Sequence, residues 1–308
     1  MAITAKDVND LRQKTGIGMM ECKKALTEAN GDPEEAIKIL REKGLAVAAK
    51  KSSRIAAEGV VDVAISEDGK TAAIIEVNIE TDFAAKNETF QKFVRDLLAI
   101  LLAKKPANME EFLALDFDGT VTVEGAVKDK VFTIGENINI RRFELITGKL
   151  NAYVHGKGQM GVVVVCDCDD SAFGTEKFKE VSKNVALQIC AMAPLYVTKE
   201  DVPAAIIEEE KAIITSTIKN DPKNANKPAN IIEKMVEGKA SKYYDTNCLL
   251  CQDYVKDDSM KVEKYLASEK DALGSEIKIV SFVRWEKGEG LEKKEEDFAA
   301  EIEKLTKK

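Results

Sequence analysis

The chain has 308 residues, of which 32% are charged and 44% hydrophobic, and its formal net charge is −8. This balance is typical of a globular protein with a sizeable core, and the length predicts two or more structural units. An acidic chain lacks the broad basic surface that nucleic acids require, so we expect no nucleic-acid partner. There is no apolar run of about 18 residues and no apolar leader at the N-terminus, so we expect no membrane partner and a cytoplasmic setting.

Residues 1–54 predict a compact N-terminal module of three helices. Apolar residues at helical spacing place one helix at about 5–15 and a second from about Met19, and the Asp-Pro pair at 32–33 is typical of the start of a third. Met19 and Met20 are adjacent, and neighbours on a helix point about 100° apart, so both cannot face one small core. Two interpretations stay open for them: partly buried core residues, or an exposed contact for another protein.

The third helix is expected to end near Gly44, before a stretch that is rich in Ala, Lys and Ser. We interpret residues 45–58 as a hinge or a connecting helix, and the pair Lys50-Lys51 as solvated charges. A module of about forty residues buries little surface alone, so we expect a binding module or an appendage.

The middle of the chain contains an internal repeat. Strand-like runs joined by tight turns precede a helical pattern, and the arrangement returns 88 residues later, with Asp82 matched by Asp170 as a helix cap and Phe90 by Phe178. The simplest architecture is α+β, with two related units of antiparallel strands and a helix packed on one face of each. We assign residues 55–140 to the first core unit, and residues 141–198 with 246–285 to the second.

An insertion and a C-terminal module complete the predicted organisation. Isoleucines recur at helical spacing on both sides of a proline-containing break, so residues 199–245 predict an antiparallel helical hairpin, which could pair two copies as a homodimer. A final strand at 277–285 is expected to return to the second sheet. Residues 286–308 predict a terminal helix whose apolar face carries Phe298, Ile302 and Leu305.

The most informative stretch is EVNIETDFAAKNETF at residues 76–90. A strand ends here and a helix begins, with Thr81 or Asp82 well placed as the N-cap because either side chain can accept from unpaired first-turn N–H groups. Phe83 precedes the apolar stripe of this helix, and the repeat has Ser171 at its position, so the core does not require an aromatic there. An aromatic side chain outside the core is well placed to enter a pocket on another molecule.

Two motifs suggest enzyme chemistry, but their surroundings disfavour it. Residues 156–161 match the GxGxxG pattern of dinucleotide-binding folds, yet a strand rather than a helix follows at 162–165, which predicts a hairpin turn. DFDGT at 116–120 resembles the motif of haloacid-dehalogenase-type phosphatases, whose first Asp attacks from a buried strand beside a magnesium ion. Residues 109–115 predict a short helix instead, so a magnesium-dependent phosphatase that uses Asp116 stays an alternative hypothesis.

The cysteines and the single histidine, His155, do not form a recognisable metal or catalytic set. Zinc would need four ligands gathered from the CxC pair at 166–168 and the CxxC pair at 248–251, and the apolar neighbours of the second pair favour small core residues. With one histidine no hydrolase triad is credible, so we expect His155 on the surface or at an interface. We therefore predict no catalytic residue, no metal and no cofactor.

The whole chain resembles the elongation factor Ts family, whose members are guanine nucleotide exchange factors for the translational GTPase elongation factor Tu. The resemblance rests on stretches that occur in the family's order: TGIGMMECKKALTEANGD (15–32), EVNIETDFAAKN (76–87), IGENINIRR (134–142), YVHG (153–156), MGVVVV (160–165), KMVEGK (234–239) and GEGLEKKEEDFAAE (288–301). It implies a ubiquitin-associated-like N-terminal module, a core of two subdomains, a helical-hairpin insertion and a C-terminal module.

The resemblance also implies a function, the release of GDP from elongation factor Tu by protein binding rather than by catalysis. The residues that match the family's partner contacts are Thr81, Asp82, Phe83, Lys86 and Asn87 in one loop, and Met19, Met20, Lys51, Ile134, Gly135 and His155 elsewhere. Phe83 would wedge between helices of the partner, and Asp82 would help to displace the groups that organise its magnesium. An adaptor that acts through the N-terminal module alone is a further alternative.

Overall fold

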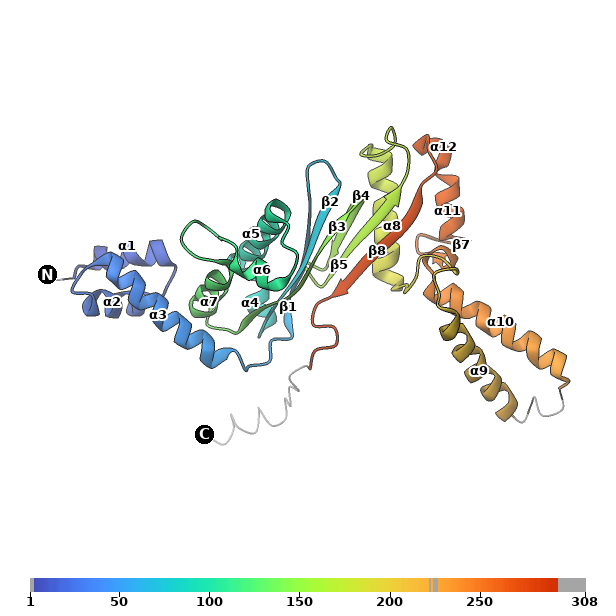
Figure 1. The fold of residues 1–308 in the computed structure, drawn as a ribbon, viewed down its shortest axis with the longest axis horizontal. Helices are drawn as coiled ribbons and strands as arrows, with labels where there is room; N and C mark the ends of the chain where they lie inside the picture. Colours follow the sequence, from blue (N-terminus) through green and yellow to red (C-terminus); the bar gives the residue numbers. More distant parts are fainter. Residues whose placement is uncertain (1–2, 222, 224–226, 293–308) are drawn as a thin grey trace.

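The computed structural model describes residues 3–221, 223 and 227–292. Within them the protein is an elongated α+β molecule, which confirms the predicted class (Figure 1). The N-terminal helices lie at one end, the sheets occupy the middle, and a helical hairpin projects from the other end. No helix among these described residues combines the length and the apolar character of a membrane span.

The N-terminal module forms the helices that the sequence predicts, α1 (Ala5–Thr15), α2 (Met19–Glu28) and α3 (Pro33–Lys51). Asp32 caps α3, because its carboxylate accepts hydrogen bonds from the N–H groups of Glu34 and Glu35. The small core between the helices includes Val8, Leu11, Leu26, Ala36 and Leu40.

The expectation that α3 ends near Gly44 is wrong, because the helix continues to Lys51. Gly44 is buried where α3 crosses α7 (Val123–Ile134), and a Cβ atom there would lie 3.5 Å from Cβ of Phe132. The glycine therefore permits a close approach of two helices rather than a break. Phe132 also packs against the core of the N-terminal module, so the module is docked on α7 rather than joined by a hinge alone.

Strands β1 (Glu58–Ile65), β2 (Thr71–Ile79) and β3 (Ile138–Thr147) form the first antiparallel sheet, in the order β1-β2-β3. Helix α5 (Glu88–Lys104) packs on one face of this sheet, and the second sheet covers the other. Every residue of β2 is buried because both of its faces are covered. The short helices α4 (Asp82–Ala85) and α6 (Met109–Ala114) lie on the connection between β2 and β3.

Strands β4 (Lys149–His155), β5 (Met160–Asp167) and β8 (Lys278–Glu286) form the second antiparallel sheet, in the order β4-β5-β8. The predicted return of a final strand to this sheet is confirmed. Helix α8 (Glu176–Met192) packs on the face of the sheet that points away from the first sheet.

The internal repeat is confirmed by the helices. Helix α8 begins and ends 88 residues after α5, and Phe90 and Phe178 are both buried beneath their sheets. The residues that follow the two helices, Lys105 and Ala193, both adopt the left-handed conformation, with φ of 49° and 44°. The two units therefore share backbone geometry as well as a sequence pattern.

The helices of the two units are related by 88 residues, but their strands correspond at an offset that is one residue larger. Ile74 faces the space between the sheets, whereas Val162, its partner at the helical offset, faces α8. The two middle strands also shift register against their outer neighbours, β2 after Glu76 and β5 after Val165. By register and by face, Glu76 therefore corresponds to Val165.

The matched aspartates are not the helix caps that the repeat predicts. Thr81 caps α4 and Thr175 caps α8, each through a side-chain oxygen that accepts from a first-turn N–H group. Asp82 is the first residue of α4, and Asp170 lies in the turn before α8, where its carboxylate pairs with Lys149.

The glycines at 158 and 161 allow the two sheets to pack closely. A Cβ atom on Gly161 would lie 2.7 Å from Cγ1 of Val61, and one on Gly158 would lie 2.5 Å from Cγ1 of Val60. The β4–β5 turn rests on β1, where the N–H of Val61 donates to the carbonyl of Gly158 at 2.9 Å. The predicted hairpin turn is confirmed, and packing between the sheets explains this part of the glycine pattern.

Helices α9 (Ala204–Asn220) and α10 (Ala229–Asn247) form the predicted hairpin (Figure 1). The chain then returns to the second unit through a 3-10 turn (Leu249–Cys251), β6 (Asp253–Tyr254), β7 (Asp257–Lys261), α11 (Val262–Ser268) and α12 (Lys270–Leu273). Tyr265 stacks on Tyr254 with the ring centroids 4.2 Å apart, and its hydroxyl accepts from Asn184 of α8. The predicted terminal helix with Phe298, Ile302 and Leu305 lies outside the described residues.

Candidate functional site

Phe83 lies on α4, just beyond the end of β2, with 82% of its surface exposed. Ala85 of the same short helix is buried, so α4 is held against the core by a small residue while the aromatic ring remains outside. Burial of a Phe side chain stabilises a protein by roughly 1.5–3 kcal/mol, and this ring does not contribute that energy to the fold. The prediction that Phe83 stands outside the core is confirmed.

Residues 81–87, which we call the Phe83 loop, are held by two consecutive helix caps. The hydroxyl of Thr81 accepts from the N–H of Ala84 at 3.2 Å, and the Asn87 side chain accepts from the N–H of Thr89 at 2.8 Å. Each bond satisfies an N–H group that a helix start leaves unpaired. The predicted continuous helix is therefore two helices, α4 and α5, with Asn87 beginning the second.

A carboxylate just beyond the end of α7 braces the start of the Phe83 loop. The Glu136 side chain accepts from the backbone N–H of Thr81 at 2.9 Å and from its hydroxyl at 2.7 Å. Glu136 follows Ile134 and Gly135 at the end of α7, and the ammonium group of Lys51 donates to the carbonyl of Gly135. The structure thus brings three of the predicted contact residues next to the loop.

Glu136 is a site residue that the sequence interpretation missed. It stands beside Gly135 within the IGENINIRR stretch, but nothing in the local pattern pairs it with Thr81, which lies 55 residues away. The interpretation of Lys51 as a solvated charge is wrong, because its ammonium group is engaged by the Gly135 carbonyl and the residue is half-buried.

Asp82 and Lys86 form an ion pair of 2.6 Å across one turn of the Phe83 loop. The hydrogen bond from Lys86 holds the pKa of Asp82 below its usual value, so this carboxyl is anionic at neutral pH. The Lys86 ammonium group also lies 5.9 Å from the centroid of the Phe83 ring. An exposed pair of this kind contributes little to stability, so both charges can be redirected to another molecule at small cost.

A hollow of about 620 Å³ lies beside the loop, lined by Asp82 and Lys86 on one side and by residues 156–159 of the β4–β5 turn on the other. His155 directly precedes that turn. Its side chain is exposed, and its Nδ1 lies 3.0 Å from the hydroxyl of Tyr153. Its exposure fits the expectation of a position on the surface or at an interface, and the turn that follows it faces the Phe83 loop across the hollow.

Met19 and Met20 lie on the first turn of α2, with 51% and 65% of their surfaces exposed. The interpretation of both as core residues is therefore wrong, since the buried residues of α2 are Cys22, Ala25 and Leu26. Neither methionine lines the hollow beside the Phe83 loop. They form a separate exposed apolar pair on the N-terminal module.

The structure does not place Asp116 where the phosphatase hypothesis requires it, at the end of a buried strand. Asp116 follows α6 rather than a buried strand, and its carboxylate accepts from the N–H of Gly119 at 3.0 Å within a local turn. The Asp118 carboxylate likewise accepts from the backbone and hydroxyl of Thr120. Across the described part of the chain, no cluster of three or more His, Cys, Asp or Glu side chains is arranged to hold a metal ion.

The cysteines are free thiols, and most are buried. Burial raises the pKa of Cys166 to about 12 and that of Cys248 to about 11, so both thiols are protonated at neutral pH. The thiolate is the nucleophilic form of cysteine, so neither of these thiols is activated as a nucleophile. This agrees with the interpretation of these residues as small core side chains.

Comparison with known proteins agrees with the residue patterns. The family described as "Elongation factor TS" matches residues 80–289. Elongation factor Ts of Clostridium kluyveri is 48% identical over 307 residues, which cover 98% of each chain. The chain belongs to the elongation factor Ts family. Elongation factor Ts of a Nitratiruptor species is 45% identical over 98% of each chain, and that of Clostridium perfringens is 44% identical over 98% of this chain and 99% of its own.

As a member of the elongation factor Ts family, the chain has a role in translation elongation during protein biosynthesis. The matched range begins one residue before the Phe83 loop and also contains Ile134, Gly135 and His155. The similarity to the full-length elongation factor Ts proteins extends over the N-terminal module, which carries Met19 and Met20.

Proposed function

We propose that this protein is a guanine nucleotide exchange factor that binds the GDP form of elongation factor Tu, perturbs its magnesium and phosphate site and promotes GDP release so that GTP can bind. The observation that carries the proposal is the exposed ring of Phe83 on a loop that two helix caps and Glu136 hold in place. A rigid aromatic anchor that needs no ordering before contact is the kind of group that dominates protein interfaces.

Exchange of this kind requires binding energy and no covalent chemistry. A factor that binds the nucleotide-free or metal-free GTPase more tightly than the loaded form must, by linkage, weaken nucleotide binding by the same factor. Each 1.4 kcal/mol of coupling is about tenfold. Burial of one Phe side chain stabilises by roughly 1.5–3 kcal/mol, so Phe83 alone supplies on the order of tens- to a hundredfold, and other contacts must add to it.

We assign the roles within the Phe83 loop as follows. Phe83 enters between helices of elongation factor Tu near its magnesium site. Asp82, held anionic beside Lys86, turns to polar groups that organise the metal. Thr81 and Asn87 keep the loop in shape through their capping bonds.

The remaining contacts lie along the length of the molecule. Met19 and Met20 offer an exposed apolar pair to the nucleotide-binding domain of the GTPase, and His155 faces its more distant domain. Lys51 donates to the carbonyl of Gly135, which with Ile134 directly precedes Glu136, the residue that holds Thr81. We assign Lys51, Ile134 and Gly135 to the edge of the same contact. In this proposal the factor acts in the cytoplasm, and the α9–α10 hairpin is available for self-association.

The test is a GDP-release measurement with the two purified proteins. Elongation factor Tu is loaded with a fluorescent GDP analogue and chased with excess unlabelled GDP, with and without this chain. The proposal predicts that release is at least tenfold faster with the chain and that the rate saturates as its concentration rises. Release at the rate seen with buffer alone would overturn it.

A further inference from the structure

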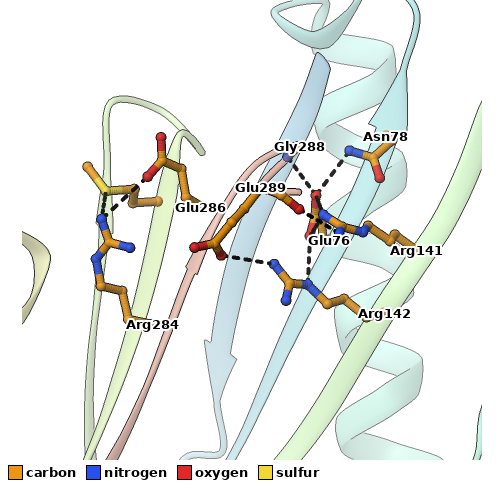
Figure 2. Close-up of polar contacts among 9 residues, drawn as sticks. Glu76, Asn78, Arg141, Arg142, Arg284, Glu286, Gly288 and Glu289 are labelled. Atoms are coloured by element: carbon orange, nitrogen blue, oxygen red, sulfur yellow. Dashed lines mark hydrogen bonds and ion pairs between the residues drawn. The ribbon is translucent and has the colours of Figure 1, made fainter. Parts of the chain in front are cut away.

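Glu76 of β2 is a carboxylate with no exposed surface, buried between the two sheets. Its oxygens accept from Arg141 at 3.0 Å, from Arg142 at 2.7 Å and from the Asn78 side chain at 3.1 Å (Figure 2). Removal of a charge from water is costly unless partners of this kind surround it. Burial raises the pKa of Glu76, but hydrogen bonds from Gly288, Asn78, Arg142 and Arg141 outweigh it and hold the pKa below its usual value.

The fold itself does not require a carboxylate at this position. Val165 is the structural counterpart of Glu76 in the second sheet, since each residue precedes the register shift of its middle strand. Val165 is also buried and packs in the apolar core between the sheets. A sheet of this design is therefore complete with an aliphatic residue there, and the charge of Glu76 needs a separate explanation.

The explanation lies in a contact with the chain beyond β8. The N–H of Gly288 donates to Glu76 at 2.8 Å, although the two residues are 212 positions apart. Arg141 donates to the carbonyl of Glu289 at 2.6 Å, and the guanidinium of Arg142 stacks on Trp285, near the end of β8, at 4.4 Å from its ring centroid. As Figure 2 shows, Glu76 and its two arginines bind the chain that follows β8 to the first sheet, while β8 itself belongs to the second.

The position of Gly288 is defined closely. Its φ is 67°, and a Cβ atom on it would lie 2.2 Å from the carbonyl oxygen of Ala57, so other residues cannot occupy this place without movement of the backbone. The neighbouring Lys287 pairs with Glu58 at the start of β1. Lys287 also lines the hollow beside the Phe83 loop, together with Asp82.

We propose that Glu76 is a positioning residue for exchange, which anchors residues 287–289 to the first sheet and so fixes one wall of the hollow beside the Phe83 loop, where the GTPase makes contact. The inference rests on the proposed function and deepens it. Glu76 has no exposed surface and acts through the anchored segment, so loss of the anchor weakens the encounter with the GTPase and leaves the final displacement of GDP intact.

The test compares four full-length variants: Glu76→Gln, Gly288→Ala, the double variant, and Glu144→Gln as a control that removes the same charge from an exposed position on β3. For Glu76→Gln and Gly288→Ala we expect at least a tenfold rise in the concentration that gives half-maximal GDP release. The maximal rate is expected to stay within twofold of wild type, and the control to match wild type in both quantities. Amide hydrogen exchange at residues 287–289 is expected to rise at least tenfold in both variants.

The double variant separates anchoring from general damage to the sheet. If Glu76 acts through the anchored segment, the half-maximal concentration of the double variant should lie within twofold of that of Glu76→Gln. Once Glu76→Gln has freed the segment, the change at Gly288 has no anchor left to disrupt. Additive losses in the half-maximal concentration would overturn the proposal, as would a fall in maximal rate with unchanged amide exchange. If Glu76→Gln does not fold, Gly288→Ala decides by the same two readouts.

Failure of this inference is distinguishable from failure of the proposed function. A wild-type chain that leaves GDP release unchanged overturns the proposed function, and the role of Glu76 in exchange with it. Normal stimulation by the wild type and by both anchor variants overturns only the role of Glu76.

Discussion

The hydroxyl of Thr81 donates to the carboxylate of Glu136 over 2.7 Å, and this bond ties the first residue of the Phe83 loop to the end of α7. The backbone N–H of Thr81 donates to the second oxygen of the same carboxylate. Since the Thr81 hydroxyl also caps α4, one side chain links the loop, the helix that carries Phe83 and the neighbouring end of α7.

Replacement of Glu136 by Ala is expected to loosen the loop without unfolding the protein. Two hydrogen bonds at an exposed position are lost, so the free energy of unfolding should fall by about 1 kcal/mol. The maximal rate of GDP release should fall several-fold, because part of the binding energy of Phe83 is then spent on ordering the loop in the step that displaces GDP. Urea unfolding and release kinetics measure the two quantities, with Glu67→Ala in the exposed β1–β2 turn as the control. Equal maximal rates in all three proteins would contradict this role.

The buried carboxylate of Glu76 makes stability depend on pH. Because its folded pKa lies below the ordinary 4.5, its contribution is fully present above that value and is lost as the pH falls through the folded pKa. Glu76→Gln leaves two guanidinium groups without their carboxylate, so it should lower the free energy of unfolding by about 3 kcal/mol at pH 7.

Urea unfolding of wild type and Glu76→Gln between pH 7 and about pH 3 tests this linkage. The difference in unfolding free energy between the two proteins should stay constant down to about pH 5 and shrink at lower pH. A difference that is the same at every pH would show that Glu76 does not carry the charge that the structure assigns to it.

Replacement of Gly161 by a larger residue is expected to disturb the packing between the two sheets and to lower the stability of the protein. A methyl group there would lie 2.7 Å from Cγ1 of Val61, so Gly161→Ala is expected to destabilise by about 1–3 kcal/mol. Truncation of Val61 to Ala removes the atom in the way, and the double variant should therefore lose less than the sum of the single losses. Thermal unfolding of the three variants measures this, and strictly additive losses would argue against a direct contact.

Much of the fold could be predicted because the patterns that specify it are local or repeated. The bounds of α1 and the start of α3 at the Asp-Pro pair follow from residues a few positions apart. The repeat also made Phe83 stand out, since Ser171 occupies the matching position. The sequence does not show that α3 continues through Gly44, because a glycine that ends a helix and a glycine that lets two helices meet look alike without the partner, here Phe132.

The contacts that hold the site together could not be predicted, because they join distant parts of the chain. Glu136 meets Thr81 across 55 residues, and Glu76 meets Gly288 across 212. Only the packing of two sheets and the docking of α7 bring these groups together. Periodicity within a helix or strand carries no information about such pairs.

The proposed function depends above all on the ring of Phe83 as the group that drives GDP from elongation factor Tu. Phe83→Ala should keep its unfolding free energy within about 0.5 kcal/mol of wild type, because the ring is exposed. Leu195→Ala is the matched control, because it truncates a different exposed apolar side chain, with 64% of its surface exposed. In a saturating fluorescent-GDP release assay, we predict that Phe83→Ala lowers the maximal rate by about ten- to a hundredfold while the control matches wild type. A folded Phe83→Ala variant that releases GDP as fast as wild type would contradict the proposed function.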